Sequence, residues 1–240
     1  MALQPRDRTY AATAATAVGA DVDAGLRTYM LRVYNYMALG VALTGILAMV
    51  VAMNPALMQT VAIGPMKWAL FAGILGLGWF SPRLMLNGST TAAHVCFWVY
   101  AAMWGALIAP MFYIYTGESI VRVFFITSAA FAGTSLYGYT TKRDLTTMGR
   151  FLMMASIGIL VAIVVNIFMQ SAAFHYFLAI VVVLVFAGLT AYETQAIKDS
   201  YLAGDHADTA TKKAVFGAFL LYGSFITMFI WLLTIFGSRD

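Results

Sequence analysis

FLMMASIGILVAIVVNIFM, residues 151–169, is a run of apolar side chains that no charged residue interrupts. A helix needs about 20 mostly apolar residues to cross the hydrocarbon core of a bilayer. This run has that length and composition, so it predicts a transmembrane helix.

The whole chain shares this apolar character. Of its 240 residues, 62% are hydrophobic and 10% are charged, and the mean hydropathy is +0.84. Soluble domains average about 45–50% apolar and about 25% charged residues. In lipid, only helices and closed barrels satisfy their backbone groups, and a barrel would show alternating segments of about 10 residues. The long continuous runs therefore predict an all-α membrane protein and exclude a soluble or disordered chain.

Six further segments resemble the first, and together they predict a seven-transmembrane-helix bundle over residues 26–240. Residues 1–25 are rich in Ala and Thr with scattered charges, and they predict a flexible cytosolic tail. The seven predicted helices are 33–53, 66–80, 91–113, 120–139, 151–169, 174–192 and 214–236. The first stops before Asn54-Pro55, and the second before Pro82, because proline disfavours a helical residue ahead of it.

Basic residues alternate between the two ends of the predicted bundle. Most of the 14 Lys and Arg residues fall in the N-terminal tail and in the loops after the second, fourth and sixth helices. Cytoplasmic loops carry the excess of Lys and Arg. The pattern predicts a cytoplasmic N-terminus and an outside C-terminus. It also explains the net charge of +4 without nucleic acid, so the expected partner of the basic side chains is the lipid bilayer.

Sequence motifs for catalysis are missing. No nucleophile elbow, zinc-protease or phosphate-loop pattern occurs, and the three His residues lack metal-ligand spacing. Segment 214–236 contains no Lys, so a retinal Schiff base is excluded. The single Cys96 excludes an intramolecular disulfide. We therefore expect no enzyme, cofactor or metal site.

Glu118 and Arg122 have the spacing of an ion pair one helical turn apart.

One polar stretch, YETQAIKD at residues 192–199, closes the sixth predicted helix. Glu193 follows directly on an apolar run, so its side chain starts near the membrane boundary. Two interpretations remain open from the residues alone. The carboxylate reaches the aqueous interface, or it is a protonatable gate that faces the bundle interior.

Three stretches then point to a known family. GLTAYETQAIK at 188–198, SLYGYTTKRDL at 135–145 and LYGSFI at 221–226 resemble motifs of the Bax inhibitor-1 family. The resemblance covers about residues 27–236. It implies a seven-helix bundle in which the other six helices surround a central helix seven.

The same resemblance implies a function. Family members are described as pH-sensitive calcium leak channels, in which an aspartate in helix six and another in helix seven share a proton. A basic residue near the end of helix two acts as a latch. By position, the gate corresponds to Glu193 and Ser224 and the latch to Arg83. Ser224 cannot ionise, so we expect weaker pH sensitivity than two acids would give.

Two functions therefore stay open. The first is a pH-sensitive calcium or cation leak, or a regulator of membrane stress. The second is a non-transporting accessory subunit, because some bacterial relatives bind a membrane-anchored AAA protease of the FtsH type. Either function fits a multi-pass protein of a bacterial inner membrane.

Overall fold

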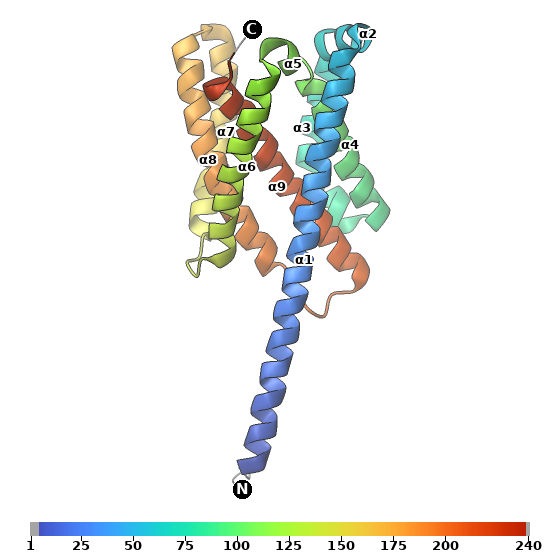
Figure 1. The fold of residues 1–240 in the computed structure, drawn as a ribbon, viewed down its shortest axis with the longest axis vertical. Coiled ribbons are helices and arrows are strands. Elements are labelled where there is room, and N and C mark those ends of the chain that lie inside the picture. The colour runs from blue at the N-terminus through green and yellow to red at the C-terminus, as the bar shows by residue number, and fades with distance from the viewer. Residues whose placement is uncertain (1–4, 239–240) are drawn as a thin grey trace.

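The computed structural model describes residues 5–238, with side chains from Ala24 onward except at position 62. This range is helical and contains no strand (Figure 1). Seven helices in it are long and apolar enough to cross a membrane, which confirms the predicted number. They are Ala24–Met53 of α1 (Pro5–Met53), α3 (Met66–Asn87), α4 (Thr90–Ile108) continued by α5 (Met111–Ile114), α6 (Gly117–Thr140), α7 (Thr146–Met169), α8 (Ala172–Asp199) and α9 (Ala207–Phe236).

The first span ends where the sequence predicts. α1 stops at Met53, and Asn54 accepts hydrogen bonds from the backbone N–H groups of Ala56 and Leu57 at 3.0 and 3.2 Å. This cap starts the short helix α2 (Pro55–Leu57), which leads into a π-helical turn, η1 (Met58–Ile63). At the other end, α1 projects beyond the bundle (Figure 1). Residues 1–4 of the expected flexible tail lie outside the described residues, and the flexibility of 1–25 stays a prediction.

The predicted end of the second span is wrong. α3 continues through Pro82 to Asn87. Proline has no N–H, so the carbonyl of Gly78 loses its usual donor. The hydroxyl of Ser81 donates to that carbonyl instead, at 3.0 Å. This local hydrogen bond lets the helix pass a residue that ends most helices.

The predicted end of the sixth span is also wrong, because α8 runs to Asp199. Thr194, Gln195 and Ile197 are buried in the bundle. The polar residues after Tyr192 thus keep helical spacing and pack inward. As a consequence, Glu193 lies inside a helix and about 9 Å from its end, at the usual rise of about 1.5 Å per residue.

The expected ion pair of Glu118 with Arg122 does not form in the described part of the chain. Arg122 instead donates to the carbonyl of Phe236 at 3.2 Å and to the hydroxyl of Ser238 at 3.4 Å. Carbonyls at the end of a helix lack intrahelical donors and attract a cation. The start of α6 therefore holds the end of α9.

α9 crosses the bundle obliquely and forms its centre (Figure 1). It packs on α1, α3, α4, α6 and α8, whereas α7 packs mainly on α8. The central position of the last helix agrees with what the resemblance implies. α7, however, lies outside α8 rather than against α9.

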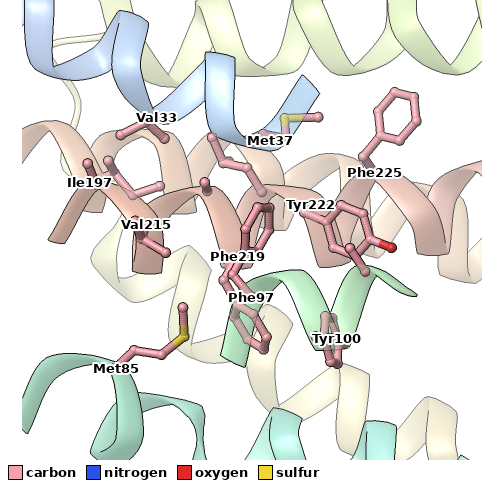
Figure 2. Packing of buried hydrophobic residues seen from close by; sticks show 14 of the residues in the cluster. Val33, Met37, Met85, Phe97, Tyr100, Ile197, Val215, Phe219, Tyr222 and Phe225 are labelled. Carbon is pink, nitrogen blue, oxygen red and sulfur yellow. The ribbon is translucent and has the colours of Figure 1, made fainter. Parts of the chain in front are cut away.

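Aromatic side chains pack in the core around α9, among them Phe97, Tyr100 and Tyr222 (Figure 2). The ring of Tyr222 lies edge-on to Phe97 and Tyr100, at centroid distances of 5.8 and 5.9 Å. Its hydroxyl lies 2.6 Å from that of Thr44, which is 2.9 Å from the carbonyl of Ala101. These contacts join α1, α4 and α9 in the middle of the bundle.

Candidate functional site

Glu193 and Ser224 meet in the structure. Glu193 projects from α8 and Ser224 from α9, and these two helices pack along each other. The hydroxyl of Ser224 donates to Oε2 of Glu193 at 2.7 Å. Ser224 is buried and Glu193 is partly buried. The geometry therefore brings together the two residues that the sequence singled out, although it does not test their role.

Glu193 has no cationic neighbour. Among the side chains that the structure describes, the one ion pair joins Lys213 to Asp205, at 2.6 Å. Glu193 is thus a carboxyl group inside a membrane-spanning helix, held by a neutral hydroxyl. A carboxylate is costly in such a place unless a positive charge accompanies it, and ionisable groups there are functional candidates by default.

Arg83, the expected latch, lies elsewhere. It is exposed on α3, and no hydrogen bond or ion pair joins it to Glu193 in the described residues. The structure therefore does not bring Arg83 to the other two site residues, and its role as a latch stays a prediction.

A row of hydroxyl groups that ends at Thr194, the residue after Glu193 on α8, was not predicted from the sequence. The Tyr34 hydroxyl lies 2.7 Å from that of Ser135, which lies 3.0 Å from that of Thr194. Thr194 donates to the carbonyl of Thr190 at 2.8 Å, so it accepts from Ser135. Ser135 in turn accepts from Tyr34. The three residues come from α1, α6 and α8, and no local sequence pattern links positions so far apart.

Gln195, two residues after Glu193 on α8, binds the loop between α6 and α7. Its Oε1 accepts from the backbone N–H of Leu145 at 2.8 Å, and its Nε2 donates to the carbonyl of Arg143 at 2.9 Å. One side chain of α8 therefore satisfies two backbone groups in the loop between α6 and α7. This contact fixes the loop between α6 and α7, which the SLYGYTTKRDL motif enters.

Metal ligands do not gather around Glu193. The described residues contain no group of three or more His, Cys, Asp or Glu side chains that could hold a metal ion. The site is one acid bonded to the hydroxyl of Ser224. Such a carboxyl group can gain or lose one proton and can attract a cation weakly.

Fold and site together define a polytopic helical membrane protein with one acid between its last two helices. A family model described as inhibitor of apoptosis-promoting Bax1 matches residues 26–240. The chain belongs to this family, the Bax inhibitor-1 family. The resemblance drawn from the three motifs is thereby confirmed.

Bacterial relatives match along nearly their whole length. Protein RP147 of Rickettsia prowazekii is 40% identical over 90% of this chain and 92% of its own. A protein of Caulobacter vibrioides is 40% identical over 91% of each chain. The inner membrane protein YbhL of Escherichia coli K12 is 38% identical over 90% of this chain and 94% of its own. Together with the seven apolar helices, this places the chain in a bacterial inner membrane as a multi-pass protein.

Proposed function

We propose that the protein is a pH-sensitive leak for calcium or similar cations, with Glu193 as its ionisable gate. The observation that carries the proposal is the hydrogen bond from Ser224 to Glu193 between α8 and α9. No cation accompanies this carboxyl group in the described residues. Membership of a family whose members are described as calcium leaks supports the same function.

A lone acid in the bundle can be neutralised in two ways. A proton can bind it, or a cation can come to rest beside it. Carboxylate and hydroxyl oxygens suit a hard cation such as Ca²⁺, which prefers about six to eight oxygen ligands. Glu193 and Ser224 supply few of them, so binding is weak. Conduction requires such weak binding, because an ion must leave as readily as it enters. Protonation removes the charge and with it the attraction.

Ser224 decides how much the gate responds to pH near neutrality. Two neighbouring acids share a proton and titrate as a coupled pair, so they lose their protons over a wider pH range. A serine takes no proton from its neighbour, so Glu193 titrates alone. We expect cation flux to respond less to pH near neutrality than in a protein with two acids.

The test is calcium flux into liposomes that contain the purified protein and an internal calcium indicator, measured between about pH 5 and pH 8. This range covers the protonation changes that proteins use near neutrality. Wild-type flux should change with pH. Glu193→Gln should abolish that change, and Ser224→Asp should make it larger near neutral pH.

Asp199→Asn is the matched control, because Asp199 is an exposed carboxylate at the end of the same helix. It should leave the pH response as in wild type. Absence of flux at every pH, or a pH response that survives Glu193→Gln, would contradict the proposal.

The proposed orientation places the N-terminus in the cytoplasm, which the distribution of Lys and Arg supports. Cysteine labelling in intact cells tests it, against a background in which Cys96 is buried. A cysteine at Thr146, where α7 begins, should react only after the membrane is permeabilised, and one at Gln170 should react in intact cells. The reverse pattern would overturn the orientation.

The alternative function is an accessory subunit of a membrane complex such as an FtsH-type protease. The observation that favours it is the exposed apolar surface of α7, of which 6% of the spanning window is buried. Purification in a mild detergent distinguishes the two functions. A chain that always purifies alone and also conducts calcium would exclude the accessory function.

A further inference from the structure

α1 and α6 both pack on α9 (Figure 1). Two cavities of about 550 and 780 Å³ form a groove between α1 and α6, and the walls of both cavities include Tyr34 and Phe131. The first cavity opens toward the N-terminal end of the α1 span at Arg27. The second continues along α1 toward Met53.

The walls of the first cavity are mostly apolar, and they include exposed side chains from both helices. Leu31 of α1 and Leu136 of α6 are 52% and 62% exposed, although both line it. In a bilayer, an unfilled space beside such side chains would lose its dispersion contacts. Acyl chains have the chemistry and flexibility to fill it.

The end of the groove is positively charged. Arg27 is exposed, and it makes no hydrogen bond or ion pair within the described residues. Lys198 lies nearby, because its ammonium donates to the carbonyl of Tyr139, another wall residue, at 2.9 Å. Among the residues whose side chains the structure describes, no carboxylate lines this cavity. Arginine binds phosphate oxygens through two parallel hydrogen bonds.

We propose that this groove binds one anionic phospholipid, with its phosphate at Arg27 and an acyl chain between α1 and α6. The lipid fills the part of the groove next to Arg27. The walls continue to Met53, about 39 Å from Arg27 along α1 at the usual rise of about 1.5 Å per residue. Half of a hydrocarbon core is about 15 Å thick, so an acyl chain of one leaflet reaches about as far as Ala38, about 16 Å from Arg27.

Neither Glu193 nor Ser224 lines this groove, although Tyr34 and Ser135 of the hydroxyl row do. The proposal does not depend on cation flux. The positive charge of Arg27 favours an anionic lipid over a helix of another protein as the occupant of the groove. A partner helix would use the apolar walls and gain nothing from Arg27, whereas an anionic headgroup uses both. Basic residues at the membrane surface each favour anionic lipids by about 1 kcal/mol, which corresponds to about a fivefold preference.

Native mass spectrometry tests the proposal. The full-length protein is equilibrated with equal amounts of phosphatidylglycerol and phosphatidylethanolamine that carry the same acyl chains. We expect one retained lipid, with phosphatidylglycerol enriched. Arg27→Gln should lower that enrichment about fivefold. Arg32→Gln is the control, since Arg32 is an exposed cation on α1 that does not line the groove.

A second pair of variants tests the walls. Ala132 lines the first cavity, so Ala132→Phe should reduce retention of both lipids. Its neighbour Gly133 has open space around it and lines none of the groove, so Gly133→Phe should behave as wild type.

Three results would overturn the proposal. They are equal retention of the two lipids by wild type, the same loss of enrichment in Arg32→Gln as in Arg27→Gln, and unchanged retention in Ala132→Phe. A lipid-free dimer as the main wild-type species would overturn it as well, because a second copy would then fill the groove.

Discussion

α9 and α7 are both apolar helices of membrane-spanning length, yet they hold opposite positions in the bundle. In α9, 56% of the spanning window is buried, and the helix packs on five others. In α7, 6% of the window is buried, and the helix packs mainly on α8. Nevertheless, the mean hydropathy of α7 is the higher of the two.

The difference shows what assembles helices in lipid. Apolar surface gains little by leaving acyl chains for another helix, so close packing and hydrogen bonds decide which helix becomes central. α9 offers both. Its small residues Ala214, Gly217 and Ala218 are buried, and the hydroxyls of Tyr222 and Ser224 bond to other helices. α7 presents large side chains such as Phe168 to lipid.

The largest expected contrast is the loss of a large aromatic ring from each helix. Tyr222→Ala removes a fully buried ring and should destabilise the protein by about 3–5 kcal/mol. Phe168→Ala removes a ring that is 83% exposed and should change stability by less than about 0.5 kcal/mol. Thermal unfolding in one detergent compares the two variants. Equal losses would break the distinction between a central and a peripheral helix.

Glycine substitutions give the next largest effect. A Cβ at Gly138 would collide with the backbone carbonyl of Ala191, where α6 meets α8. Gly138→Ala should therefore destabilise by about 1–3 kcal/mol. Gly158 of α7 has nothing near its missing side chain. There, alanine should stabilise by about 0.5–1 kcal/mol, because glycine is a poor helix former. The same unfolding assay measures both the expected loss and the expected gain in stability. Destabilisation by Gly158→Ala would show that another molecule packs against α7.

A smaller effect is expected when Tyr222 loses its hydroxyl and keeps its ring. Tyr222→Phe keeps the aromatic packing and removes the hydrogen bond with Thr44. The expected loss is about 0.5–1.5 kcal/mol. Ser156→Ala in α7 is the matched control, because the Ser156 hydroxyl bonds only to the nearby carbonyl of Met153. If Ser156→Ala lowers the stability by as much, then a hydroxyl that bonds between helices contributes no more than one that bonds within its own helix.

The smallest effect concerns the start of α7 and its pH dependence. The hydroxyl and backbone N–H of Thr146 donate to Asp144 and hold the pKa of that carboxyl below its usual value. A lowered folded-state pKa contributes stability above the unfolded pKa of about 3.9, and that stability is lost as pH falls through the lower folded pKa. Amide exchange in the first turn of α7 should therefore be constant near neutral pH and rise only in acid. Asp144→Ala should speed it at neutral pH, whereas an unchanged rate would exclude this cap.

Sequence reasoning reached most of the fold because each span carries its own apolar signal. It failed where a distant or local polar group changed the outcome. Ser81 carries α3 past Pro82, and burial of Gln195 carries α8 past Tyr192. Neither effect is visible in hydropathy.

The candidate site was only partly predictable, for a related reason. Glu193 and Ser224 were found because family motifs contain them, and the structure places them in contact. The hydroxyls of Tyr34, Ser135 and Thr194 belong to three helices, and serine and threonine are common in spans without any site. The distances between these hydroxyls are what identify them as one hydrogen-bonded row. The sequence also did not reveal that Glu193 lacks a cationic partner among the described residues, since Arg83 was the expected partner.

The amide of Gln195 imposes an order on biosynthesis. A chain leaves the ribosome N-terminus first, so α6 and α7 leave it before Gln195 does. Until then, the N–H of Leu145 and the carbonyl of Arg143 need water as their partner, which keeps their loop at the aqueous surface. Residue 195 follows Leu145 by 50 positions and then replaces that water. The loop between α6 and α7 is therefore completed by the helix that is inserted after it.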